Sequence, residues 1–219
     1  YMYWSMQHKN SSGFYTAAYT VIMDLRGNIV FISPTFSDVK HGYHVITLKV
    51  YPADPNYLIG GVDVAQTQDG PVYLWNFNHT GASSEPKEWI PLCDGATVGI
   101  HDIALAYDEA GLWLTHDKGF ALYDISSGSI LDNHQFDNVY DVNHVQVLDK
   151  DSTVILSSRD TSAFIKVDMT SGDEIWVCGG RWGTMDLIDE FGTKWPAGTS
   201  LWNGQHNVEY IGDSSYAVF

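Results

Sequence analysis

The sequence has little positive charge. Its 219 residues contain 11 Lys and Arg against 27 Asp and Glu, which gives a formal net charge of −16. A nucleic-acid-binding protein neutralises phosphates with Lys and Arg, so the charge balance excludes that class. Binding to an anionic membrane surface is excluded for the same reason, because the chain repels such a surface.

Long apolar runs are absent as well. No run reaches the roughly 18 apolar residues of a transmembrane helix, so the sequence predicts no membrane span. No charged and then apolar leader precedes Tyr1, and the chain stops at Phe219 inside the apolar run 216–219. We therefore expect a fragment of a longer protein. Charged residues make up only 17% and hydrophobic residues 44%, which is too apolar for a disordered chain.

Only two cysteines are present, Cys93 and Cys178, without the spacing of a zinc site. They are predicted either to form one disulfide or to be two buried thiols, and both alternatives stay open. Asn10 and Asn78 begin Asn-X-Ser/Thr triplets, which are acceptors for glycosylation. Together these features favour an extracellular or secretory location, periplasmic if the source is bacterial.

Helical periodicity is nearly absent, and short β-branched and aromatic runs alternate with Gly and Asn turns, which is typical of an all-β domain. A histidine opens four of these runs, and the spacings between successive copies are 57, 43 and 62 residues. The four are His44, His101, His144 and His206.

A second repeated signature is a strand that ends in Asp and is followed by a Gly turn. Its clearest copies end at Asp124 and Asp168, 44 residues apart, and an earlier copy ends at Asp24. A period of 43 to 44 residues with four short strands is typical of a β-propeller blade. We predict a β-propeller of four-stranded antiparallel blades, with only part of the ring in this chain.

The two signatures divide residues 1–219, taken as a single propeller domain, into blades. Full blades are predicted to start near residues 44, 101 and 144, between a half blade over 1–43 and another over 206–219. Insertions over 78–91 and 181–201 account for the longer spacings, and a short helix is expected over 185–191. The two halves either close a four-bladed ring or belong to a larger ring.

The innermost strand of a propeller blade lines the central channel, so the repeated histidines are predicted to converge. For a single histidine, a strand cap is the more common role. Arg159 ends the strand after the one that His144 opens, and antiparallel pairing returns it to the side of His144. A guanidinium fork suits a tetrahedral oxyanion, whereas a surface salt bridge is the alternative for Arg159. The pattern predicts a site for a small anion.

These segments resemble the arylsulfotransferase family, the PAPS-independent arylsulfate sulfotransferases of bacteria and their eukaryotic relatives. The resemblance covers most of residues 99–219, and residues 1–98 share only the blade rhythm. The motifs that carry it are residues 99–103, 141–145, 157–163, 166–168, 172–176 and 204–207.

The resemblance implies a six-bladed propeller, when complete, that moves a sulfuryl group from a phenolic sulfate ester to a phenol. It implies neither a nucleotide donor nor a cofactor or metal. The family's transiently sulfated histidine matches His206, its supporting histidines match His101 and His144, and its arginine matches Arg159. Trp182, in the second insertion, and Trp202, directly after it, are candidates to face the aryl group, although core packing is the more common role of tryptophan.

Two other functions stay open. The first is a non-catalytic secreted or cell-surface propeller that serves as a structural or assembly module, as a homo-oligomer or in an extracellular assembly. The second is a metal site in the histidine ring, against which the neighbouring Arg159 argues because it repels a cation.

Overall fold

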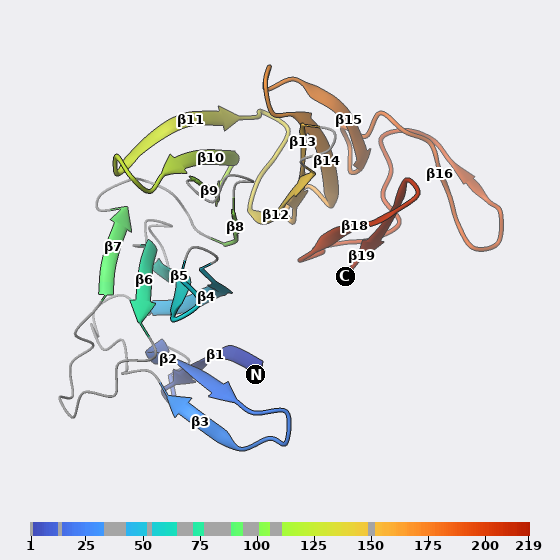
Figure 1. Ribbon diagram of the computed structural model, residues 1–219. Helices are drawn as coiled ribbons and strands as arrows, with labels where there is room; N and C mark the ends of the chain where they lie inside the picture. Colours follow the sequence, from blue (N-terminus) through green and yellow to red (C-terminus); the bar gives the residue numbers. More distant parts are fainter. Residues whose placement is uncertain are drawn as a thin grey trace. The chain divides into compact units, whose positions relative to one another are not determined.

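The computed structural model describes residues 2–12, 15–32, 43–51, 54–64, 72–76, 89–93, 101–105, 111–148 and 152–219, in several of the earlier strands by their backbone alone. Over these ranges the regular elements are all strands, as Figure 1 shows. No helix in the described residues is long and apolar enough to cross a membrane. The chain forms two compact units, Tyr1–Ile103 and Ala104–Phe219, and each is described by itself.

The first unit contains two antiparallel sheets. One has the order β1-β2-β3, with β1 (Met2–Lys9), β2 (Tyr15–Met23) and β3 (Ile29–Ile32). It therefore has three strands where the half blade over 1–43 implied two; residues 33–42 lie outside the described residues. The other has the order β4-β5-β6-β7, with β4 (Tyr43–Val50), β5 (Tyr57–Val64), β6 (Val72–Asn76) and β7 (Trp89–Cys93).

A second pair of sheets, each with four antiparallel strands, follows along the chain. One has the order β11-β10-β9-β8, with β8 (Ile103–Leu105), β9 (Gly111–His116), β10 (Gly119–Asp124) and β11 (Ser129–Gln135). The next has the order β12-β13-β14-β15, with β12 (Val142–Leu148), β13 (Thr153–Ser158), β14 (Ala163–Asp168) and β15 (Glu174–Gly179).

The core of the second unit joins these two sheets. All six residues of β9 and all six of β13 are buried, as expected for strands covered on both faces. One apolar cluster combines Trp113 and Phe120 of the first sheet with Val145, Leu156 and Ile165 of the second. Burial of this apolar surface is the main stabilising contribution to the unit.

The repeated Asp signature forms the same turn in both of these sheets. Asp124 Oδ1 accepts from the backbone N–H of Ser126 at 2.7 Å, and Asp168 Oδ1 accepts from the N–H of Thr170 at 2.8 Å. Gly128 and Gly172 follow with φ of 67° and 74°, values that favour glycine. These bonds stabilise the ionised carboxylates: a side-chain bond from Ser126 lowers the pKa of Asp124, and a backbone bond from Ser171 lowers the pKa of Asp168.

The segment after β15 contains two hairpins. The first pairs β16 (Leu187–Ile188) with β17 (Lys194–Trp195), so the helix expected over 185–191 is wrong. Asp189 Oδ1 accepts from the N–H of Phe191 at 3.0 Å and of Thr193 at 2.8 Å, which closes a turn instead. Figure 1 shows this hairpin projecting from the rest of the unit. The second hairpin pairs β18 (Val208–Gly212) with β19 (Ser215–Val218).

Candidate functional site

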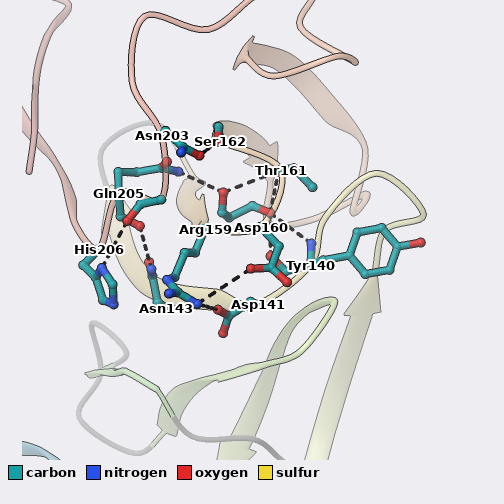
Figure 2. A network of polar contacts seen from close by, with 12 residues as sticks. Tyr140, Asp141, Asn143, Arg159, Asp160, Thr161, Ser162, Asn203, Gln205 and His206 are labelled. Carbon is teal, nitrogen blue, oxygen red and sulfur yellow. Dashed lines mark hydrogen bonds and ion pairs between the residues drawn. The ribbon is translucent and has the colours of Figure 1, made fainter.

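Gln205 ties the segment that leads into β18 to the sheet β12–β15. Its side chain is only 4% exposed. Its Nε2 donates to the carbonyl of Ser158 at 2.9 Å and to that of Ala163 at 2.7 Å, on either side of the β13–β14 loop. The Gln205 carbonyl accepts from Asn143 Nδ2 at 2.7 Å, as Figure 2 shows. Gln205 therefore fixes its neighbour His206 beside the β13–β14 loop and the start of β12.

His206 is exposed, and its ring is oriented by the backbone. Nδ1 lies 3.2 Å from the Gly204 carbonyl oxygen. Because a carbonyl oxygen only accepts hydrogen bonds, this contact places the proton on Nδ1 and the lone pair on Nε2. The backbone N–H of His206 also donates to the carbonyl of Phe219 at 3.0 Å. The contact orients an exposed imidazole ring in which Nε2, rather than Nδ1, is the candidate nucleophilic nitrogen.

Arg159 lies in the β13–β14 loop and is paired with carboxylates. Its Nη1 is 3.0 Å from Asp141 Oδ2 and 3.7 Å from Asp160 Oδ1, and its side chain is 47% exposed. The backbones are joined too, since the Arg159 N–H donates to the Asp141 carbonyl at 3.1 Å. Asp141 has φ of 54°, and its N–H donates to Asp117 Oδ1 at 3.2 Å. The cationic group is thus held in place beside Asp141.

His144 lies on β12 and faces β18. Its side chain is 12% exposed, and its Nε2 is 3.5 Å from Glu209 Oε1. The strands are linked again where the Tyr210 N–H donates to Gln146 Oε1 at 2.6 Å. Through Asn143 and Gln205 the second unit therefore connects the elements that carry His144, Arg159 and His206.

His101 belongs to the first unit and is half-buried. Its neighbour Asp102 is buried, accepts from the Ile103 N–H at 2.8 Å and pairs with Lys49 Nζ at 3.3 Å. The role that the family resemblance gives His101 stays a prediction. The side chain of His44 lies outside the described residues.

The two tryptophans proposed for substrate binding have different surroundings. The Arg181 guanidinium carbon lies 3.6 Å from the centre of the Trp182 ring, which is a cation–π contact. Trp202 packs on Phe164, with ring centres 5.5 Å apart, and covers Gly179, where an added Cβ would lie 2.5 Å from the indole. The contacts of Trp202 are those of a core residue.

The cysteines and the glycosylation acceptors were also predicted from the sequence. Cys178 is a free thiol, so the disulfide alternative with Cys93 is not found; the Cys93 side chain lies outside the described residues. Burial raises the pKa of Cys178 to about 11, as fits the alternative of a buried thiol. Asn10 is exposed, Asn78 lies outside the described residues, and glycosylation of both stays a prediction.

Several residues of the site were not assigned a role from the sequence. Asp141, Asn143 and Gln205 lie inside the quoted motifs, but nothing in their spacing reveals which atoms they contact. Glu209 lies outside those motifs. It follows His206 by three residues, a spacing that carries no signal until the position of β18 beside β12 is known.

No protein-family model and no curated protein matches the chain. Among solved structures, the chain is similar to the Dos1 propeller, with a TM-score of 0.56 and 12% identity over 96% of this chain and 52% of that one. It is also similar to a protein of unknown function from Bacteroides caccae, with a TM-score of 0.49 and 9% identity over 80% of this chain and 58% of that one.

A third similar structure is an auxiliary nutrient binding protein from Bacteroides thetaiotaomicron VPI-5482, with a TM-score of 0.47 and 12% identity over 81% of this chain and 48% of that one. The chain thus spans about half the length of the solved structures it resembles. At such low sequence identities, structural similarity shows a shared fold and nothing more. Here the similarity to the Dos1 propeller, with its TM-score of 0.56, supports the fold. The chain has the β-propeller fold predicted from its 43- to 44-residue period. None of these comparisons identifies the arylsulfotransferase family.

Proposed function

We propose that the chain carries a sulfuryl-transfer site that moves the group from a phenolic sulfate ester to a phenol, with His206 as the nucleophile. The observation that supports this best is the state of His206: it is exposed, and Nδ1 is bonded to the Gly204 carbonyl. A neutral imidazole with an available lone pair is what covalent catalysis requires.

The reaction has two balanced steps. His206 Nε2 attacks sulfur, the bond from sulfur to the aryl oxygen breaks, and the electron pair leaves with the phenolate. In the second step an acceptor phenol gives up its proton to the phenolate released in the first step, its oxygen attacks sulfur, and the pair of the N–S bond returns to Nε2. Arg159 would hold the sulfuryl oxygens, because a guanidinium donates several hydrogen bonds to a tetrahedral anion.

The pairing of Arg159 supports a second candidate function. Its Nη1 already lies 3.0 Å from Asp141 Oδ2, so an incoming sulfate ester competes with a bound carboxylate. In the second candidate, Arg159 and Asp141 form a structural ion pair in a non-catalytic extracellular propeller used for assembly, as a homo-oligomer or with partner proteins. In that case the histidines have no catalytic role.

The test is transfer from a nitrophenyl sulfate to a simple phenol by the purified full chain. Sulfuryl transfer predicts product formation, and mass spectrometry without acceptor should detect one added sulfuryl group on His206. His206→Ala should abolish both signals. Arg159→Lys keeps the charge but loses the planar fork, and should weaken transfer without abolishing it.

A control separates loss of chemistry from loss of folding. Asn203→Ala alters the same segment and removes only a hydrogen bond with the Ser162 hydroxyl, so it should retain transfer. If the folded chain shows neither transfer nor a sulfated histidine, the catalytic proposal is wrong. Light scattering after size-exclusion chromatography then tests the assembly candidate, which predicts a homo-oligomer or a complex.

A further inference from the structure

The Arg159 guanidinium is part of a network in which carboxylates predominate. Asp141 Oδ2 lies 3.0 Å from Arg159 Nη1, and Asp160 Oδ1 lies 3.7 Å from the same nitrogen, as Figure 2 shows. The carboxylate of Asp117 accepts from the backbone N–H of Asp141 at 3.2 Å. Three carboxylates therefore belong to the same contact network as a single guanidinium.

A lysine lies at the border of this network. Lys118 Nζ is 4.9 Å from the centre of the Tyr140 ring, which is a cation–π contact. Tyr140 directly precedes Asp141, so the ammonium weakens the negative potential at this place. It does not cancel it, because three carboxylates stand against two cations and the whole chain has a net charge of −16.

Asp141 is held firmly in its position. Its N–H donates to Asp117, its carbonyl accepts from the Arg159 N–H at 3.1 Å, and the next residue, Val142, is fully buried. Its side chain is 17% exposed, compared with 47% for that of Arg159, so water screens the Asp141 charge only weakly. The carboxylate is thus a fixed component of the site.

The guanidinium keeps donors for a ligand. Both carboxylates contact Nη1, and among the residues that the structure describes they are the contacts of the guanidinium. A guanidinium has five N–H donors in a planar fork, so Nη2 and Nε of Arg159 can still donate to two oxygens of a tetrahedral anion. An anion bound there shares Arg159 with Asp141 and lies close to its negative charge.

We propose that Asp141 is a specificity-determining residue, which makes the site accept monoanionic esters and reject dianionic ones. The inference rests on the sulfuryl-transfer function proposed above. A sulfate monoester carries one negative charge, whereas a phosphate monoester carries almost two at neutral pH, because its second pKa is about 6. A second charge on the ligand doubles its attraction to Arg159, but it also doubles its repulsion by the carboxylates, which outnumber the guanidinium.

The experiment measures binding of two analogues that cannot transfer their group, by isothermal titration calorimetry on the purified full chain. Phenylmethanesulfonate carries one charge, and phenylmethylphosphonate, which has nearly the same shape, carries two at about pH 8.5. The wild type should bind the sulfonate about tenfold more tightly than the phosphonate. Arg159→Gln should abolish binding of the sulfonate, because its tetrahedral group loses the donors that hold it.

Asp141→Asn is the decisive variant. Asparagine tolerates the left-handed backbone that Asp141 adopts at φ of 54°. Loss of the repulsion should strengthen sulfonate binding about threefold and phosphonate binding about tenfold, the square of that factor, so the ratio of the two Kd values falls about threefold. Release of Arg159 from its ion pair changes both affinities by one common factor and leaves this ratio unaltered.

Two variants accompany it. Asp213→Asn is the matched control, since Asp213 also has a positive φ, 49°, and is exposed in the β18–β19 turn, at the end of β18 away from His206. It removes the same charge from the chain and should not alter the ratio. Asp160, 63% exposed, is better screened, so Asp160→Asn should lower the ratio only about 1.5-fold; it tests the proposal even if Asp141→Asn does not fold.

The outcomes separate this inference from the proposed function. Equal affinities of the wild type for both analogues, or an unchanged ratio in folded Asp141→Asn, would overturn the inference. Binding of neither analogue, or retention of binding in Arg159→Gln, would overturn it too. Selective binding of the sulfonate without transfer from a nitrophenyl sulfate would support the selectivity and contradict sulfuryl transfer, so the two failures are distinguishable.

Discussion

The sheets β8–β11 and β12–β15 are alike at one end and different at the other. At the end with the Asp turns, Asp124 and Asp168 occupy the same position and accept the same type of backbone bond. At the opposite end, β9 and β10 are joined by two residues, 117–118, whereas β13 and β14 are joined by four, 159–162. The longer loop contains Arg159 and is tied to Gln205 and Asp141.

Corresponding positions show what this difference means. His116 pairs with the first residue of β10 as Ser158 pairs with the first residue of β14. His116 is engaged within its own sheet, with Nε2 3.0 Å from Asn133 Oδ1. Ser158 instead offers its carbonyl to Gln205, from outside the sheet. The repeat therefore preserves the turn that supports folding, and the opposite end is where the second sheet acquires the candidate site.

The largest expected effect tests whether the two sheets contribute equally to the core. Leu114 and Leu156 hold equivalent positions and are both fully buried. Leu114→Ala and Leu156→Ala should each lower the free energy of unfolding by about 2–5 kcal/mol, because each leaves a cavity. Urea denaturation measures both. A marked inequality would show that the sheets differ in folding as well as in function.

A smaller effect is expected at the connection found only in the second sheet. Gln205→Ala removes the buried side-chain donor to the carbonyls of Ser158 and Ala163 and should lower the free energy of unfolding by about 1–3 kcal/mol. It should also reduce transfer, because His206 loses its anchored neighbour. Thr199→Ala, which removes one exposed hydrogen bond nearby, is the control and should change neither quantity appreciably. Unaltered stability in Gln205→Ala would contradict the anchoring role.

The Asp turns should respond alike to mutation. Asp124→Ala and Asp168→Ala each remove acceptors for two turn residues, so each should lower the denaturation midpoint by a similar amount. Asp→Asn variants keep one acceptor oxygen and should lose less. Neither change should affect sulfuryl transfer. A loss of transfer in Asp168→Asn alone would mean that the two ends of the second sheet are coupled.

The smallest expected effect concerns pH. Burial lowers the pKa of His116 from its ordinary value of 6.5. The folded chain then binds a proton less readily than the unfolded chain, so this contribution to stability is present above pH 6.5 and is lost as pH falls toward the lowered pKa. His116→Gln should therefore flatten the fall in the denaturation midpoint between about pH 7 and about pH 5. Equal slopes in wild type and variant would contradict this account.

Local patterns were sufficient for much of the fold. The Asp signature and the alternating apolar runs predicted the strands around Asp124 and Asp168, because these turns are built from residues close together in sequence. The helix over 185–191 was wrong because Asp189 closes a turn onto Phe191 and Thr193, which competes with helical bonding. The pairing of Cys93 and Cys178 could not be predicted, since it depends on contacts between distant strands.

For this protein, the sequence by itself determined the all-β class, the 43- to 44-residue period and the acidic net charge, which excludes binding to polyanions such as nucleic acids. It also singled out His144, Arg159 and His206 through repetition and scarcity. Only the tertiary structure decided three contacts: Asp141 forms an ion pair with Arg159, Gln205 anchors the segment that carries His206, and Glu209 lies beside His144. The reason is physical: periodicity records which face of a strand is buried, whereas a polar contact between strands depends on how whole sheets pack.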